Sequence, residues 1–246
     1  MGVMLITGAS RGLGAATARA AAAVGWDVAI VYRSDRDKAH AVAAAVEAFG
    51  RRSAVIQADV ASESDVIDAF DLSEDRLGPV GCLVNNAGIA PGYGAFLDLT
   101  VSDLERTWAV NLTGAFLCAR EALRRMSTQR SGTGGSIVNV SSKAAVLGGP
   151  GEWIHYAASK GGIDTLTIGL SKEAAAHGVR VNGVRPGLIE GGFGPWAPDG
   201  RIERMAPGVP MGRPGTPEEV ATAVIWLASP AASYVTGTTI DVTGGR

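Results

Sequence analysis

A tyrosine and a lysine four residues apart stand in the otherwise plain stretch GEWIHYAASKGG, residues 151–162. On a helix, Tyr156 and Lys160 would lie one turn apart on the same face. As a surface pair they would stabilise the helix by only about 0.2–0.5 kcal/mol. In a partly buried site, an ammonium about 5 Å away would favour the tyrosinate by roughly 3 kcal/mol, or about two pKa units. The spacing therefore predicts a tyrosine whose proton can be exchanged in catalysis.

Glycines follow the first apolar run of the chain, in LITGASRGLG at residues 5–14. Glycine allows a tight turn and a close approach to a diphosphate, and the helix that opens there would present free N–H groups to its charge. The spacing Gly8-x3-Gly12-x-Gly14 departs from the G-x-G-x-x-G fingerprint, so its position in the first strand–turn–helix unit carries the argument. The residues that we expect to contact the diphosphate are Gly8, Ser10, Arg11, Gly12, Leu13 and Gly14.

The second apolar run, 28–32, leads into Arg33 and Ser34. A nucleotide site selective for NAD has an acid after this strand, whereas one for NADP has a base near the 2′-phosphate. Arginine binds phosphate oxygens in a bidentate fork, so Arg33, together with Arg11, favours NADP. NAD remains possible if Asp35 points inward, and both arginines could instead be ordinary solvated surface residues.

Apolar runs of strand length alternate with alanine-rich helical stretches. The expected strands are 3–6, 28–32, 53–57, 82–84, 136–140, 180–184 and 239–242, and the expected helices are 14–24, 37–49, 63–77, 103–128 and 156–177. Strands that are apolar throughout, each followed by a helix, are typical of a parallel sheet covered on both faces. We therefore predict a single-domain α/β protein with a Rossmann-type, doubly wound sheet of about seven strands.

The segment 186–217 is dense in glycine and proline and breaks this alternation. Long connections inside a compact domain are often functional, so we expect a substrate lid at 188–215, with a short helix at 202–205. Trp153, Phe193 and Trp196 either wall the substrate cleft or belong to the core. His155 is expected on another helix face than Tyr156, in solvent.

Composition excludes several functions. With 246 residues and a formal net charge of −2, the chain offers no electrostatic basis for binding nucleic acid or acidic lipid. Its cysteines, Cys82 and Cys118, lie in apolar runs away from other potential metal ligands, so we expect buried free thiols and no metal site. No apolar span is long enough for a membrane, and the N-terminus enters a strand directly. A cytoplasmic, soluble protein is expected.

Several motifs in order along the chain resemble the short-chain dehydrogenase/reductase family, in particular its glucose-dehydrogenase-like and 3-oxoacyl-carrier-protein-reductase-like members. The resemblance runs from the first strand to Gly244–Gly245. Its motifs are the glycine turn, Asp59–Val60, Asn85–Asn86–Ala87–Gly88, the tetrad Asn111, Ser142, Tyr156 and Lys160, and Pro186–Gly187. The resemblance implies that Asp59, Val60, Asn86, Ala87, Gly88, Pro186, Gly187 and Ile189 help to bind the cofactor, together with Tyr156 and Lys160. From the residues alone, Asp59 could also cap the next helix and Asn86 could brace backbone.

The resemblance also assigns roles in catalysis. Tyr156 would be the general acid in reduction and the base in oxidation, and Lys160 would bind the nicotinamide ribose and lower the pKa of the tyrosine. Ser142, rather than Ser141, would bind the substrate carbonyl, and Asn111 would hold a water in a proton relay. The family often has threonine where Gly191 stands.

The implied function is NADP(H)-dependent hydride transfer with a small carbonyl or secondary alcohol substrate, by a homotetramer. The expected contact surfaces of the tetramer are the helices at 103–128 and 156–177. A non-catalytic NADP(H)-binding sensor or scaffold is the alternative, although it would not need a complete tetrad.

Overall fold

In the computed structural model, which describes residues 2–246, seven strands form one sheet in the order β3-β2-β1-β4-β5-β6-β7, and every neighbouring pair is parallel. The strands are β1 (Val3–Thr7), β2 (Asp27–Tyr32), β3 (Ser53–Gln57), β4 (Val80–Asn85), β5 (Gly135–Val140), β6 (Val179–Pro186) and β7 (Thr239–Val242). The predicted fold class is confirmed.

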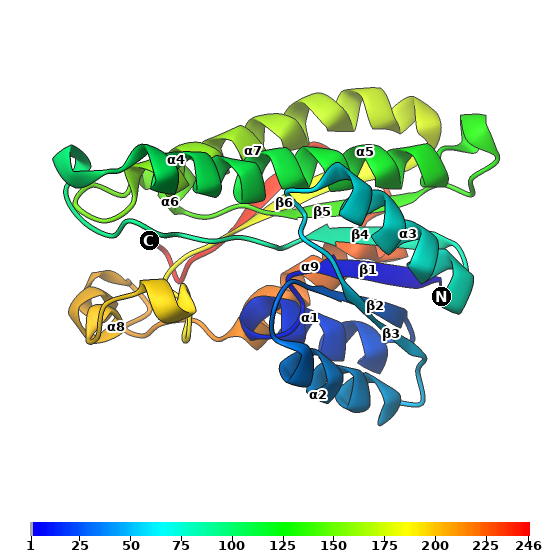
Figure 1. Cartoon of the computed structure of the whole chain (residues 1–246), viewed down its shortest axis with the longest axis horizontal. Helices are drawn as coiled ribbons and strands as arrows, with labels where there is room; N and C mark the ends of the chain where they lie inside the picture. The colour runs from blue at the N-terminus through cyan, green and yellow to red at the C-terminus, as the bar shows by residue number, and fades with distance from the viewer. Residues whose placement is uncertain (1) are drawn as a thin grey trace.

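Helices cover both faces of the sheet (Figure 1). One layer contains α3 (Glu63–Leu77), α4 (Val101–Trp108), α5 (Gly114–Met126) and α7 (Ile154–Ala174). The other contains α1 (Gly12–Ala23), α2 (Arg36–Glu47) and α9 (Pro217–Ala228). Two short helices, α6 (Ala144–Leu147) and α8 (Arg201–Met205), lie in connections.

The sheet separates two apolar cores. Successive side chains of a strand point to opposite faces, so Val3 and Leu5 of β1 pack into one core while Met4 and Ile6 pack into the other. All four are essentially inaccessible to solvent. Burial on both faces is the reason that this strand reads as a continuous apolar run. Cys82 and Cys118 are buried free thiols, as predicted.

The structure differs from the helix predictions at two places. The expected single helix 103–128 is divided into α4 and α5 by a π-helical turn, Ala109–Thr113. Helix α9 was not predicted, although Thr216 and Glu219 form a capping box around Pro217 at the first helical position. The adjoining glycine- and proline-rich stretch concealed this start signal.

The strand order reverses between β1 and β4, because β1 continues to β2 on one side and β4 continues to β5 on the other. Loops that leave the carboxyl ends of neighbouring strands diverge at such a point and leave a crevice, which is where ligands bind to doubly wound sheets. Within the described residues, no helix combines the length and apolar character needed to cross a membrane.

Candidate active site

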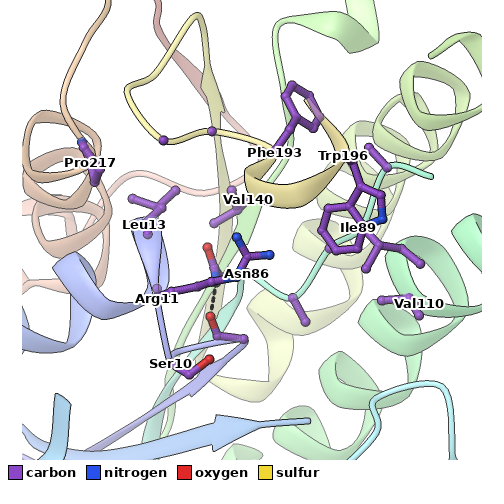
Figure 2. Close-up of a pocket in the computed structure, with 18 of the residues that line it drawn as sticks. Ser10, Arg11, Leu13, Asn86, Ile89, Val110, Val140, Phe193, Trp196 and Pro217 are labelled. Atoms are coloured by element: carbon purple, nitrogen blue, oxygen red, sulfur yellow. Dashed lines mark hydrogen bonds between the residues drawn. The ribbon is translucent and has the colours of Figure 1, made fainter. Parts of the chain in front are cut away.

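A cavity of about 650 Å³ opens at the carboxyl ends of the strands. Figure 2 shows Arg11 and Leu13 on the side of α1, with Trp196 opposite them beside Ile89. Every residue that the sequence predicted for cofactor binding lines this cavity: Gly8, Ser10, Arg11, Gly12, Leu13, Gly14, Arg33, Ser34, Asp59, Val60, Asn86, Ala87, Gly88, Tyr156, Lys160, Pro186, Gly187 and Ile189. Ser142 lines it as well.

The glycine turn suits a diphosphate because its backbone packs too closely for a Cβ atom on one side and faces the cavity on the other. A Cβ at position 14 would lie 2.5 Å from the carbonyl oxygen of Gly8, and Gly8 and Gly12 have φ values of 64° and 54°. Asn86 braces the turn, since its Nδ2 donates to the carbonyl oxygens of Thr7 and Gly8 at 2.9 and 3.1 Å. The turn therefore presents the N-terminus of α1 to the cavity without side chains in the way.

Basic residues gather where the second strand ends. Arg33 and Lys38 line the cavity there, and Lys38 was not singled out from the sequence. Asp35 is the N-cap of α2: its side chain accepts from the backbone N–H of Lys38 at 3.2 Å and from Nζ at 2.5 Å. These hydrogen bonds hold the pKa of Asp35 below its usual range. Asp35 also lines the cavity, where it is paired with the cation of Lys38.

Asp59 does not cap the next helix. The N-cap of α3 is Ser62, whose side chain accepts from the N–H of Asp65. Asp59 instead accepts from the N–H of Ala61 at 3.0 Å, and its other carboxylate oxygen lies 3.9 Å from Arg33.

Tyr156 and Lys160 lie on the first turns of α7, with Nζ 5.6 Å from the centroid of the tyrosine ring. Nζ is buried and donates to the carbonyl oxygen of Val140 at 2.8 Å. Burial lowers the pKa of Lys160 to about 8, against the charge of Asp164, which raises it.

Burial raises the pKa of Tyr156 to about 12, and the Ser142 hydroxyl and the Arg201 guanidinium lower it only in part. The expectation that Lys160 holds this pKa low is therefore wrong for this arrangement. Desolvation of the phenolate outweighs the neighbouring charges.

The two serines after β5 point in different directions. Ser141 donates its hydroxyl to the carbonyl oxygen of Lys160 at 3.1 Å and so fastens β5 to α7. Ser142 accepts from the N–H of Ala144 at 3.1 Å, which leaves its own proton free for another acceptor. Of the two, Ser142 is the one whose hydroxyl acts on Tyr156.

Asn111 lies in the π-helical turn between α4 and α5 and is fully buried behind the cavity wall. Its Nδ2 donates to the carbonyl oxygen of Ile89 at 2.9 Å and to Ser159 at 3.2 Å, while its Oδ1 accepts from the N–H of Ile89 at 2.8 Å. These bonds join the π-helical turn to α7 and to the segment after β4. π-helical turns occur frequently at functional sites.

The segment 188–215 begins and ends at one point, where Ile189 and Gly215 form an isolated parallel bridge. Between them, Phe193 and Trp196 line the cavity, and Phe193 has a left-handed φ of 65°. Arg11 lies over the ring of Trp196, 5.6 Å from its centroid, so the segment reaches across the cavity to the glycine turn.

The structure decides the open alternative for Trp153 and corrects the prediction for His155. Trp153 does not line the cavity; it is buried and stacks behind Phe193, with ring centroids 4.4 Å apart. His155 is buried rather than solvent-exposed, with Nε2 2.8 Å from the carbonyl oxygen of Pro91. The N-terminus of α7 is covered by the 91–94 loop, which the sequence pattern did not indicate.

Sequence reasoning missed Arg201 and Glu152. Arg201 lies on α8, lines the cavity and forms a two-point ion pair with Glu152, just before α7. The two residues are 49 positions apart, so no local spacing signals their contact.

Comparison with known proteins gives the family. A family model described as enoyl-(acyl carrier protein) reductase matches residues 8–246. An uncharacterized oxidoreductase of Escherichia coli (strain K12) is 46% identical and covers 100% of both chains. An L-rhamnose 1-dehydrogenase (NAD(P)(+)) of a Sphingomonas species is 40% identical and covers 98% of this chain and 94% of its own.

A solved short-chain type dehydrogenase/reductase from Mycobacterium marinum has a TM-score of 0.92 and 36% identity, covering 99% of this chain and 94% of that one. The chain therefore belongs to the short-chain dehydrogenase/reductase family. It is an oxidoreductase of the NAD(P)-dependent class that acts on CH–OH and C=O groups.

Proposed function

We propose that the protein is an NADP(H)-preferring oxidoreductase in which Tyr156 transfers the proton to or from a small carbonyl or secondary alcohol substrate. The observation that carries the proposal is the convergence of Tyr156, Lys160 and Ser142 on the same cavity as the glycine turn. The nicotinamide, when bound, supplies or accepts the hydride; the chain supplies orientation, a proton and hydrogen bonds to the developing oxyanion.

The proton carried by Tyr156 supports its role as the acid in reduction. With a pKa of about 12, the phenol is fully protonated near neutral pH, and Ser142 can donate to the same substrate oxygen. Lys160, with a pKa of about 8, remains largely protonated at neutral pH and can donate to the ribose. Asn111 would hold a water that returns a proton to Tyr156 by way of Lys160.

The preference for NADP rests on the charges at the end of β2. Arg33 and Lys38 line the nucleotide end of the cavity, and Asp35 is engaged by Lys38. Arg11 lines the same cavity. In the proposed complex its guanidinium turns from Trp196 toward a phosphate, whose oxygens it can bind with two hydrogen bonds.

The substrate would be a small molecule, with segment 188–215 as the lid over it. The name of the Sphingomonas relative suggests a sugar, and the sequence resemblance suggests a 3-oxoacyl thioester, so both belong in a substrate panel. We also propose a cytoplasmic homotetramer, as the family resemblance implies, with no role for nucleic acid or membrane.

The test is NADPH oxidation with ketones, aldehydes, ketoses and 3-oxoacyl thioesters, by the wild type and by Tyr156→Phe. Turnover by the wild type that Tyr156→Phe lowers by about 100- to 10,000-fold, with NADPH still bound, supports the proposal. NADPH binding without turnover on any substrate would instead support the sensor.

A further inference from the structure

Arg201 is a buried cation in the wall of the catalytic cavity. The residue is only 9% exposed, and its Nε and Nη2 donate to Oε1 and Oε2 of Glu152 at 2.7 and 2.8 Å. A buried guanidinium needs such a partner, because an uncompensated buried charge is strongly destabilising. The two-point contact also fixes the plane of the guanidinium, since both ends of the fork are held.

Aromatic rings connect this guanidinium to the catalytic tyrosine. Its Cζ lies 5.1 Å from the ring centroid of Trp153 and 5.0 Å from that of Phe193. The ring of Phe193 lies edge-on to Tyr156 with centroids 5.0 Å apart. Arg201 and Tyr156 line the same cavity, and the charge of Arg201 lowers the pKa of Tyr156. Arg201 is therefore within the part of the cavity where a substrate held by Tyr156 must lie.

One edge of the guanidinium has no protein partner. Arginine has five N–H donors, of which two are on Nη1. Glu152 takes Nε and Nη2, and within residues 2–246 Nη1 makes no hydrogen bond. Nη1 remains accessible to solvent, so a ligand oxygen in the cavity can accept its hydrogen bond in place of water.

We propose that Arg201 is a specificity-determining residue whose Nη1 donates a hydrogen bond to a second, uncharged oxygen of the substrate, most simply a hydroxyl group near the reacting carbonyl. The inference rests on the proposed function, because it takes Tyr156 as the residue that holds the reacting oxygen. The substrate class is then a hydroxylated carbonyl compound, or the corresponding polyol in oxidation, rather than a plain ketone.

Glu152 makes an uncharged oxygen a better partner for Nη1 than a carboxylate. Its carboxylate already neutralises the guanidinium, so a substrate carboxylate at Nη1 would place two negative charges beside one positive charge. Desolvating an anion there would add a further penalty that a hydroxyl group avoids. Within the described residues, Glu152 is the charged partner of this guanidinium, and the rings of Trp153 and Phe193 beside it are uncharged.

The kinetic test compares substrates that differ by one hydroxyl group. NADPH-dependent reduction of cyclohexanone and of 2-, 3- and 4-hydroxycyclohexanone is measured for the wild type and Arg201→Met. We expect the wild type to prefer at least one hydroxylated ketone by tenfold or more in kcat/KM. Arg201→Met should remove that preference, lowering kcat/KM for the hydroxylated ketone about 10- to 100-fold more than kcat/KM for cyclohexanone.

Two further variants separate specificity from folding. Arg201→Met leaves Glu152 without its partner, so the double variant Arg201→Met/Glu152→Gln is measured as well and should show the same loss of preference. Arg204→Met is the matched control, because Arg204 lies exposed on the same helix; it should retain the wild-type preference. Equal losses on plain and hydroxylated ketones in both Arg201 variants would overturn the proposal and leave Arg201 a structural residue.

A binding measurement distinguishes this inference from the proposed function. Binding of cyclohexane-1,2-diol to the protein with NADP⁺ is followed by tryptophan fluorescence, since Trp153 and Trp196 adjoin the site. Binding that weakens at least tenfold in Arg201→Met supports the assignment of Arg201, even if no ketone is turned over and the proposed function fails. Turnover of ketones with diol binding unaffected by Arg201→Met would overturn the assignment alone.

Glu152→Gln tests why the oxygen is uncharged. The variant keeps a hydrogen-bonding side chain but leaves the guanidinium with its full charge. The ratio of kcat/KM for 4-oxocyclohexanecarboxylate to that for 4-hydroxycyclohexanone should then rise about tenfold or more. An unchanged ratio would contradict neutralisation by Glu152.

Discussion

Tyr156 and Lys160 are neighbours on α7, and burial moves their pKa values apart, raising the first to about 12 and lowering the second to about 8. Both shifts have one cause, since removal from water disfavours the charged form of each group. Near neutral pH the phenol of Tyr156 is therefore uncharged and Lys160 is still largely protonated. Desolvation, rather than attraction between the two side chains, dominates this pair.

Burial of Lys160 has a consequence for stability. Its pKa is about 8 in the folded chain and 10.5 ordinarily, so unfolding takes up a proton between these pH values. The loss of folding stability that comes from burying the charged ammonium is complete below pH 8 and disappears as the pH rises toward 10.5. Lys160→Met should therefore raise the free energy of unfolding by about 2 kcal/mol at pH 7. The gain should shrink markedly by pH 9.5.

Urea unfolding of both proteins at pH 7 and pH 9.5 measures this difference. The hydrogen bond from Lys160 to Val140 opposes the gain at pH 7, where Nζ is largely protonated. A variant less stable than the wild type at pH 7 would show that this hydrogen bond outweighs desolvation.

At this scale, the sequence predicted residues that belong to local motifs and missed those joined only by the fold. Ser142, Tyr156 and the glycines were found because their spacing is short and fixed by one element. Arg201 and Glu152 meet through a segment whose path depends on the packing of Phe193 and Trp153, and no periodicity encodes that path.

The junction between β2 and α2 is the element that would distinguish NADP from NAD in the proposed function. Arg33 follows the strand directly and Lys38 lies on the first turn of the helix, and both line the cavity. A 2′-phosphate contacting either residue would form charge-assisted hydrogen bonds, which contribute about 1.5–3 kcal/mol each.

Replacing both cations should therefore reverse the cofactor preference. Arg33→Ser/Lys38→Ser is expected to weaken NADPH binding by at least about 100-fold while changing NADH binding less than about threefold. Fluorescence titration with each cofactor gives both constants. Arg36→Ser is the control, because Arg36 lies on the same helix turn but outside the cavity, close to His40. Equal weakening of both cofactors would contradict the assignment of the phosphate to this junction.

Element boundaries show where local signals suffice. The seven strands were found because burial on both faces gives uninterrupted apolar runs. The division of 103–128 was not found, because a π-helical turn differs from an α-helix by one residue in its hydrogen bonding and leaves the apolar pattern nearly unchanged. Asn111 lies in that turn, so the deviation is also what positions a predicted site residue.

At the scale of the whole molecule, apolar side chains remain exposed on the layer that contains α5 and α7. Phe116 and Ile168 are each 49% exposed on these helices. They are consistent with the contact surfaces that the family resemblance implies for a tetramer, since large exposed apolar patches commonly mark protein interfaces.

Charges introduced on this surface should dissociate the proposed tetramer. Phe116→Glu/Ile168→Glu is expected to convert a tetramer into dimers or monomers, because a buried unpaired carboxylate is strongly unfavourable. Light scattering coupled to size-exclusion chromatography measures the mass. Phe49→Glu is the control, an exposed aromatic residue just after α2 in the other layer. A tetramer that survives the double substitution would place the interface elsewhere.

The central claim, that Tyr156 supplies the proton, is tested most directly by single-turnover kinetics with NADPH bound in advance, because product release then does not limit the rate. With the best carbonyl substrate of the panel, Tyr156→Phe should reduce the single-turnover rate by about 100- to 10,000-fold. Its affinity for NADPH should stay within about threefold of the wild type. A variant that reduces the substrate at nearly the wild-type rate would contradict the account.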